Sequence, residues 1–324
     1  MCPCRASARV RELMLSRIAE SLFWIGRYVE RAEDTARILD VQFHRLLEDP
    51  WIDEDAACRA LLNVMGVGAP AGTGHALGSR EVCDLLAYDA TNPSSIMGAL
   101  AAARDNARGA REAISSEMWE CLNSTWYSLP EQVENAHNLG PYVFFNFVKE
   151  RVAIMGGLAN STLSRDDGWR FLVLGSSLER VDMTARLLSA RWGDAAGSPG
   201  WVTTLRCCSA HEAYLRTYRR AVDASLVAEF LLLDRLFPRS VFNALSTAEQ
   251  CLAELDPLTT RSGLDDEARR ILGRARTDLE FRRATELLRD LPSHLSLVQT
   301  ACSDAATAVA ERYFRQTAPI EWTA

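Results

Sequence analysis

The sequence predicts an all-α protein built as a bundle of long helices. Three observations support this fold class. Apolar residues recur at steps of three and four through most of the 324 residues, which is the helical period. The alternation of apolar and polar residues that is typical of strands is scarce. Several prolines fall between the periodic segments and separate them, namely Pro50, Pro238, Pro257 and Pro292.

The first long helix is predicted over 16–48, because Ser16 is a suitable N-cap and Pro50 stops the helix. Its apolar residues form one stripe for packing against other helices. They are Ile18, Leu22, Ile25, Val29, Ala32, Ala36, Leu39, Phe43 and Leu46. A short helix is predicted over 54–65, and the glycine-rich stretch 66–78 is predicted to be a flexible loop.

Helices follow along the rest of the chain. Before residue 193 they are predicted over 80–88, 95–126, 142–160 and 166–192. Ser94 or Ser95 is expected to cap the second of these and Pro130 to break it, whereas Gly156 and Gly157 are expected to interrupt the third. Glycines between 193 and 200 predict a linker. Beyond it, helices are predicted over 202–219, 223–236, 240–255, 265–291 and 294–314.

These elements divide the chain into three predicted parts. Residues 1–13 are expected to be a disordered leader, and Met14 is an alternative start because the helical pattern begins directly after it. Residues 14–195 are expected to form a helical core, and residues 196–324 to form C-terminal helices packed on that core.

One segment of the chain is nearly repeated. Residues 26–39 (GRYVERAEDTARIL) recur 149 positions later at 175–188 (GSSLERVDMTARLL). The repeated letters include charged residues, which core packing alone does not require. The repeat predicts an internal duplication of a Glu-Arg helix, with either two equivalent sites or one site built from two halves.

Each copy carries a polar stripe on one helical face, because its members are spaced four, three and four residues apart. The stripes are Gly26, Glu30, Glu33 and Arg37 in the first copy and Gly175, Glu179, Asp182 and Arg186 in the second. Glu33 with Arg37, and Asp182 with Arg186, are expected to form ion pairs within a helix. The glycines indicate that a neighbouring backbone or a ligand comes close there.

Three interpretations of the stripes stay open at this point. The charges form interhelical salt bridges that fix the register of the bundle, or they line a polar cavity that binds a ligand. The third interpretation is a di-metal carboxylate site, although the Glu-x-x-His pairs of such sites are missing.

A second polar cluster lies in the middle of the chain. Arg104, Arg108 and Arg111 share a helical face and repel one another unless carboxylates or a bound anion offset them. Glu112 and Glu117 are the expected partners, and a bound phosphate or carboxylate is the alternative. The candidate anion-binding residues here are Asn106, Arg108, Arg111 and Glu112.

Composition excludes several classes of protein. A net charge of −7 disfavours a general nucleic-acid binder. No apolar run approaches the roughly 18 residues that a membrane helix needs. An odd count of nine cysteines in a chain of this size disfavours a secreted disulfide framework, so the predicted compartment is the cytoplasm. The glycines of 66–78 lack the Gly-Lys-Ser/Thr of a phosphate loop, and neither a cofactor nor a metal is predicted.

Three motifs in order resemble the bacterial Alpha-E family, an all-helical domain with a repeated Glu-Arg motif. They are Met14–Arg17 with Trp24–Glu33, Asn106–Glu112, and Leu163–Asp166 with Gly175 and Leu178–Arg180. The resemblance covers nearly all of 14–314. The chain departs from the pattern where Ser176-Ser177 replaces the Arg-Tyr of the first copy, which predicts that the two half-sites are not equivalent.

The resemblance implies a function through gene neighbours, since Alpha-E genes adjoin or are fused to a circularly permuted ATP-grasp ligase. Genes for transglutaminase-like and proteasome-like peptidases often accompany them. We therefore expect a partner subunit that docks the ligase and helps to bind its amino-acid or peptide substrate. The expected binding residues on and beside the repeats are Arg27, Arg31, Glu33, Arg37, Arg165, Arg180, Asp182 and Arg186. The alternatives are an enzyme that uses Glu30 or Glu179 as general base, and a purely structural scaffold.

Overall fold

The computed structural model describes residues 4–68, 76–192, 198–257 and 262–314, and within these ranges every regular element is a helix. The predicted all-α fold is confirmed. Parts of the predicted loop 66–78 and of the predicted linker 193–200 lie outside the described residues.

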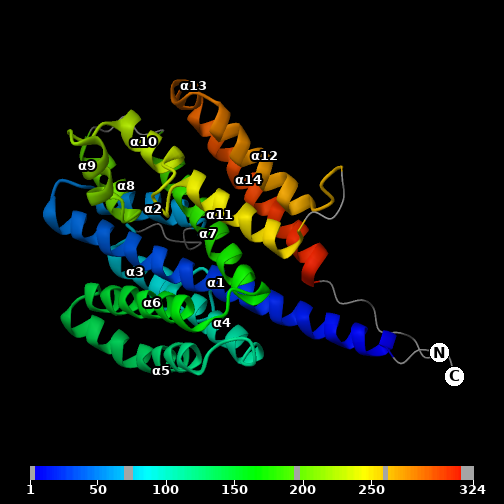
Figure 1. Cartoon of the computed structure of the whole chain (residues 1–324). Coiled ribbons are helices and arrows are strands. Elements are labelled where there is room, and N and C mark those ends of the chain that lie inside the picture. Colours follow the sequence, from blue (N-terminus) through cyan, green and yellow to red (C-terminus); the bar gives the residue numbers. More distant parts are fainter. Residues whose placement is uncertain (1–3, 69–75, 193–197, 258–261, 315–324) are drawn as a thin grey trace.

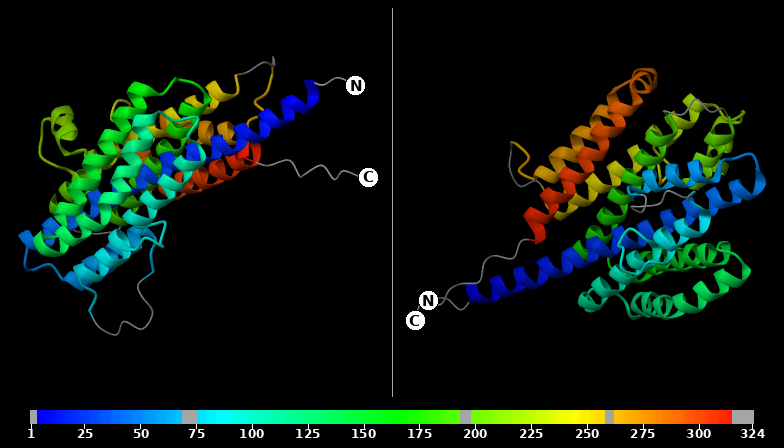
Figure 2. Two further views of the ribbon diagram at one scale, coloured as in Figure 1. Left: turned by 90° about the horizontal axis from the view of Figure 1, so that it is seen from below. Right: turned by 180° about the vertical axis from the view of Figure 1, so that it is seen from behind.

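The longest helix is α1 (Cys4–Glu48), which runs through the molecule and projects at its N-terminal end (Figures 1 and 2). It begins before the predicted cap, so Ser16 lies inside the helix and α1 includes most of the segment expected to be a leader. The predicted apolar stripe is confirmed: Leu22, Ile25 and Leu39 are fully buried.

The first half of the chain continues with α2 (Glu54–Met65), α3 (Ser79–Cys83), η1 (Asp84–Tyr88), α4 (Ile96–Gly109), α5 (Ser116–Leu139) and α6 (Tyr142–Thr162). The single helix predicted to reach residue 126 is wrong. It is divided between α4 and α5, because Ser95 and Ser115 each cap a separate helix through their side-chain oxygens.

Two predicted helix breaks are also wrong. Pro130 lies inside α5 with its side chain exposed, where water can satisfy the backbone carbonyl that loses its N–H partner. Gly156 and Gly157 lie within an unbroken α6, since each costs only about 1 kcal/mol relative to alanine.

The second half consists of α7 (Asp167–Trp192), α8 (Ser198–Cys207), α9 (His211–Tyr218), α10 (Ala224–Leu233), α11 (Val241–Leu255), α12 (Glu267–Phe281), α13 (Ala284–Arg289), α14 (Leu291–Val309) and η2 (Ala310–Phe314). The helix predicted over 202–219 is split near Ser209, whose φ of 54° is incompatible with a helix. The helix predicted over 265–291 ends at Phe281, and α13 follows it separately.

The helices pack as two sets with the same pattern of neighbours. In the first set α1 packs against α4 and α6, and α5 packs against both of these. In the second set α7 packs against α11 and α14, and α12 packs against both of these. The hairpin of α5 and α6 lies on one side of the molecule and that of α12 and α14 on the other (Figure 1). The common origin of the two sets stays a prediction.

The sets are joined where α1 packs against α7, the two helices that carry the repeated segments. Seven cysteines of the described residues are buried and unpaired, as expected for small apolar residues of helical cores. Within the described ranges, no helix combines the length and the apolar character needed to cross a bilayer.

Candidate functional site

The two repeat glycines mark the point at which α1 and α7 come closest. A Cβ built on Gly26 would stand 2.0 Å from the backbone oxygen of Leu172 in α7. A Cβ built on Gly175 would stand 2.0 Å from the backbone oxygen of Phe23 in α1. The predicted close approach at both glycines is therefore confirmed, and the approaching group is the opposite helix backbone.

Glu179 of α7 is buried and held by two arginines of α1. Arg27 Nε donates to Glu179 Oε2 at 2.8 Å. Arg31 Nε donates to Oε1 at 2.6 Å, and Arg31 Nη2 donates to Oε2 at 3.1 Å. Burial acts to raise the pKa of Glu179, but Arg27 and Arg31 outweigh it and lower that pKa below its usual range. Glu179 is therefore held as a carboxylate.

Glu30 of α1 has the reciprocal arrangement. Arg180 Nε, from the residue that follows Glu179, donates to Glu30 Oε1 at 2.7 Å. The position equivalent to Arg27 is Ser176, which cannot supply a second cation. Arg239 does so instead, with its Nη1 at 2.8 Å from Glu30 Oε1. The two half-sites therefore differ, as the sequence departure at Ser176 predicts.

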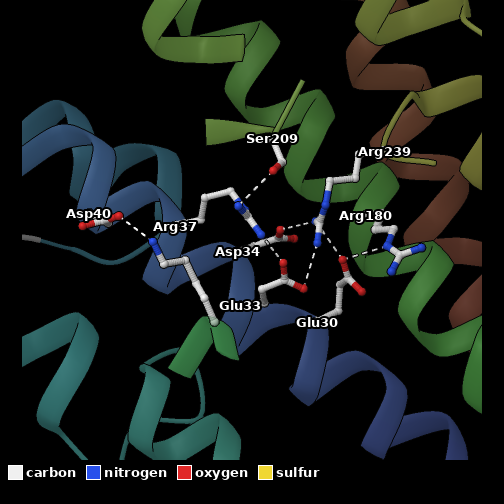
Figure 3. Close-up of polar contacts among 9 residues, drawn as sticks. Glu30, Glu33, Asp34, Arg37, Asp40, Arg180, Ser209 and Arg239 are labelled. Atoms are coloured by element: carbon white, nitrogen blue, oxygen red, sulfur yellow. Dashed lines mark hydrogen bonds and ion pairs between the residues drawn. The ribbon is translucent and has the colours of Figure 1, made fainter. Parts of the chain in front are cut away.

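Arg239 was not predicted, and it is the most connected side chain of the site. It lies just before α11 with its side chain 12% exposed, with Nη2 at 2.9 Å from Glu33 Oε2 and Nη1 bonded to Asp34. Figure 3 shows its guanidinium directed at Glu30, Glu33 and Asp34. The pKa of Arg239 is raised despite its burial, because these three carboxylates surround it.

A second pattern is repeated in the loops before α4 and α11, and the second of these loops carries Arg239. Residues 92–95 (Asn-Pro-Ser-Ser) precede α4, and residues 237–240 (Phe-Pro-Arg-Ser) precede α11. The last serine of each caps its helix, and each hydroxyl donates to a backbone oxygen six residues earlier. The backbone oxygen of Arg239 also accepts a hydrogen bond from Thr184 of the second repeat, at 3.0 Å. Aligning these two loops makes Arg239 equivalent to Ser94, and only the structure places it beside the repeat helices.

Asp34 is buried beside Arg239, and its Oδ2 has no hydrogen-bond partner. Burial raises the pKa of Asp34 to about 7; the nearby Glu30 and Glu33 add to the rise, and Arg239 opposes it. Its counterpart in the second repeat is Met183, so comparison of the two copies does not point to Asp34.

Both predicted ion pairs within a helix are present. Arg37 pairs with Glu33, and Arg186 Nε lies 2.9 Å from Asp182 Oδ2. Burial acts to raise the pKa of Glu33, but Arg239 and Arg37 lower it. Burial does raise the pKa of Asp182, although Arg186 opposes the rise. The charged face of α1 continues to Asp40, which pairs with the one lysine of the chain, Lys149, at 2.6 Å (Figure 3).

The middle cluster does not join this site. Its members lie on or just after α4, and they are Asn106, Arg108, Arg111 and Glu112. Arg108 pairs with Asp105 at 3.5 Å, and the Arg111 guanidinium lies 4.7 Å from the centre of the Trp119 ring. Asn106 donates to the backbone of its own helix. The expected pairing with Glu112 and Glu117 is not found among the described residues, where α4 ends at Gly109 and Glu117 lies on the separate helix α5.

Arg165 is also separate from the Glu-Arg residues. It donates to the side chain and backbone of Asn160, and its guanidinium stacks 4.2 Å from the centre of the Trp169 ring. Of the predicted binding residues on or beside the repeats, the structure thus brings together all but Arg165.

A cavity of about 450 Å³ lies beside the Glu30 half of the site, and we call it the α6 cavity. Its apolar wall comes chiefly from α1, α6 and α7, and its polar groups are Glu30, Glu33, Asn160, Ser176, Arg180 and Thr247. A second cavity, of about 680 Å³, lies between α14 and the other half of the crossing, where Arg27, Asp182 and Arg186 line it. The crossing itself is closely packed, so the half-sites border two cavities and enclose no shared one.

The chain matches one protein-family model over residues 14–314, with the description "a predicted alpha-helical domain with a conserved ER motif". The Glu-Arg pairs at 30–31 and 179–180 are the residues that hold α1 against α7. The chain belongs to the Alpha-E family. This Alpha-E chain is also similar to an uncharacterized protein of Mycobacterium bovis and to uncharacterized proteins of two Mycobacterium tuberculosis strains.

Each of these relatives is 25% identical to the Alpha-E chain over 284 residues, which cover 81% of this chain and 32% of the relative. The chain therefore spans about a third of the length of the curated relatives it matches. No solved structure matches it significantly.

The contacts show what the Glu-Arg residues of this Alpha-E chain do. Arginines hold both oxygens of Glu179, and Glu30 is bonded by two arginines. The lowered pKa of Glu179 makes it a poor proton acceptor, and both glutamates already have their cationic partners. The arrangement favours the interhelical salt-bridge interpretation over a general base or a di-metal site.

Proposed function

We propose that this Alpha-E chain is the helical partner subunit of an ATP-grasp peptide or amide ligase. It docks the ligase and helps to bind the amino-acid or peptide substrate, while the ligase binds the nucleotide. The observation that carries the proposal is the length of the relatives, because 68% of each lies outside the matched region. In those relatives the helical region is therefore one part of a larger polypeptide. The ligase class comes from the family resemblance.

The charge network supports a binding subunit over an enzyme that acts alone. The pKa of Glu179 is lowered by Arg27 and Arg31, which makes it a weaker base than a free glutamate. Two cavities adjoin the crossing and supply volume for a ligand. We also propose the cytoplasm as the compartment, because seven described cysteines are unpaired thiols and the ligase requires ATP.

Co-expression tests the proposal. The chain, carrying an affinity tag, is produced together with the circularly permuted ATP-grasp ligase encoded in the same genome. We expect the two to co-purify and to elute as one complex from a gel-filtration column. We also expect ADP formation by the ligase, in the presence of amino acids, to increase when the chain is added.

A matched control uses the same tagged chain with an ATP-grasp ligase of a different subfamily, which should not be retained. Separate elution of the two proteins, together with ADP formation that is unchanged by the chain, would rule out the partner role. Retention of both ligases would indicate non-specific adhesion and would count equally against it.

A further inference from the structure

The α6 cavity has the size and the wall of a small-molecule site. Its volume of about 450 Å³ falls within the range of roughly 300–1,000 Å³ that is typical of ligand pockets. Its apolar surface includes Val29 of α1, Met155 of α6 and Leu172 of α7. Such a wall binds the apolar body of a ligand, so the few polar groups in the cavity determine which end group the ligand carries.

Arg180 is the polar group with donors to spare. Its Nε donates to Glu30 Oε1, whereas its Nη1 and Nη2 donate to no other described residue. Its side chain lines the cavity and is 31% exposed. A guanidinium carries five N–H donors in a planar fork that matches a carboxylate. Arg180 can therefore bind a ligand carboxylate without releasing Glu30.

Ser176 accounts for the space beside Arg180. In the first repeat the same position is Arg27, whose long side chain bonds Glu179. In the second repeat the short Ser176 side chain lines the α6 cavity, and Arg239 reaches Glu30 from another loop. The difference between the two repeats therefore leaves volume on this side of the crossing.

The charges near the cavity favour an anion over an ammonium group. Glu30 and Glu33 are both already paired with Arg239, and Glu33 is also paired with Arg37. The third carboxyl, Asp34, has a pKa of about 7, so near neutral pH it is charged only in part. An added carboxylate meets the Nη1 and Nη2 donors of Arg180, while an added ammonium meets Glu30 and Glu33, which already have arginine partners.

We propose that the α6 cavity binds a small carboxylate with an apolar body, of the kind presented by an apolar amino acid or the apolar C-terminal residue of a peptide. Arg180 binds the carboxylate, and the wall from α1, α6 and α7 binds the body. For its biological setting this inference rests on the proposed function, because it names the class of substrate that the subunit holds. Its test uses the chain alone.

Two matched probes separate the end groups. N-acetyl-L-leucine presents the carboxylate and the apolar body without an ammonium group, and L-leucinamide presents the ammonium group without a carboxylate. Each is titrated into the purified chain by isothermal titration calorimetry, with saturation-transfer NMR as a second readout. We expect saturable binding of N-acetyl-L-leucine. The affinity for L-leucinamide should be lower by a factor of about ten or more. Equal binding of the two, or preference for L-leucinamide, would overturn the proposal.

Two adjacent glycines of α6 give a matched pair of variants. Gly156 lines the cavity and Gly157 does not, yet a Cβ on either meets nothing within 4 Å. Gly156→Phe should fill the cavity and abolish binding, whereas Gly157→Phe should leave it unchanged. Arg180→Lys keeps a cation beside Glu30 but loses the fork, so it should weaken binding about tenfold.

The variants also fix which result contradicts the proposal. Full binding by Gly156→Phe would place the ligand elsewhere, and so would equal loss in both glycine variants. Binding of N-acetyl-L-leucine by the isolated chain, combined with failure to retain the ligase, would support this site and reject the partner role. Retention of the ligase with no binding of either probe would support the partner role and reject this site.

Discussion

Glu30 and Glu179 are each bound by the arginine that follows the other in sequence. Arg31 Nε lies 2.6 Å from Glu179, and Arg180 Nε lies 2.7 Å from Glu30. The two Glu-Arg pairs thus form a reciprocal clasp between α1 and α7. The clasp explains why the charged letters of the two segments match: each segment supplies the partner that the other needs.

The first prediction concerns the carboxylates of the clasp. Glu179→Gln removes a buried negative charge and leaves Arg27 and Arg31 without a counter-ion. We expect the free energy of unfolding to fall by about 3 kcal/mol, as when one partner of a buried ion pair is lost. Glu30→Gln should act in the same direction. Urea unfolding followed by far-UV circular dichroism measures both.

The control for this series is Glu131→Gln, which alters an exposed glutamate of α5 and should change stability by less than about 0.5 kcal/mol. Wild-type stability in Glu179→Gln would contradict the clasp. It would also reopen the enzyme interpretation, in which the same substitution abolishes turnover and leaves the fold intact.

The second prediction concerns the glycines at the crossing. An alanine Cβ at Gly26 or Gly175 would stand 2.0 Å from a backbone oxygen, so the helices must move apart. Either substitution should lower stability by about 3 kcal/mol. Gly157→Ala is the opposite case, because its Cβ enters open space; it should raise stability by about 0.5–1 kcal/mol. Thermal melts of the three variants test whether the first two melt below the wild-type protein and the third above it. A melting temperature of Gly26→Ala equal to that of the wild-type protein would refute the close contact.

The fold was largely predictable because apolar residues recur every three or four positions along each long helix. The predicted spans 54–65 and 166–192 match α2 and α7 to within one residue. The errors arose where local signals compete. Pro130 has a helix-breaking preference, but on the exposed face of α5 the tertiary contacts of the helix prevail. Ser115 is an N-cap within a continuous apolar pattern, and only the structure shows that a new helix begins there.

The site was predictable only where it repeats. The matching copies identified Glu30, Glu179 and their arginines, because an unexplained charge that occurs twice is informative. Arg239 and Asp34 have no charged counterpart, since Ser94 and Met183 occupy the equivalent positions. Their importance comes from burial and from contacts across the chain, which residue spacing does not encode.

The third prediction uses the difference between the two half-sites. Arg239→Met removes the cation that Glu30, Glu33 and Asp34 share, and should lower stability by about 4 kcal/mol. Adding Ser176→Arg places an arginine at the position that Arg27 occupies in the other half, so the double variant should regain about 1 kcal/mol. Denaturant unfolding of both variants measures the gain.

Ser176→Arg in the otherwise unchanged protein is the reference for that rescue. There Arg239 already binds Glu30, and the added arginine should give less stabilisation than in the Arg239→Met background. An equal effect in the two backgrounds would mean that residue 176 does not reach Glu30, and that the halves are not related as the repeat indicates.

The fourth prediction follows from the raised pKa of Asp34. With a folded-state pKa of about 7 and an unfolded value of about 3.9, the folded protein holds an extra proton between these limits. The stability from this proton is fully present below the unfolded pKa and is lost as pH rises through 7. Between pH 5 and pH 8 the loss amounts to about 2–3 kcal/mol.

Asp34→Asn fixes the neutral form and should remove that pH dependence. The free energy of unfolding is measured in urea at pH 5, 6, 7 and 8. Its decrease from pH 5 to pH 8 should be smaller in the variant than in the wild-type protein by about 2–3 kcal/mol. Asp105→Asn, at an exposed position of α4, should leave the wild-type profile unchanged. Glu33 and Glu179 oppose the trend, because their lowered pKa values give stability that is lost as pH falls through those values. Their contribution is common to both proteins and cancels when the two stability profiles are subtracted. Parallel profiles of wild type and Asp34→Asn would contradict the prediction. They would show that Asp34 stays charged because Arg239 outweighs the effect of burial on its pKa.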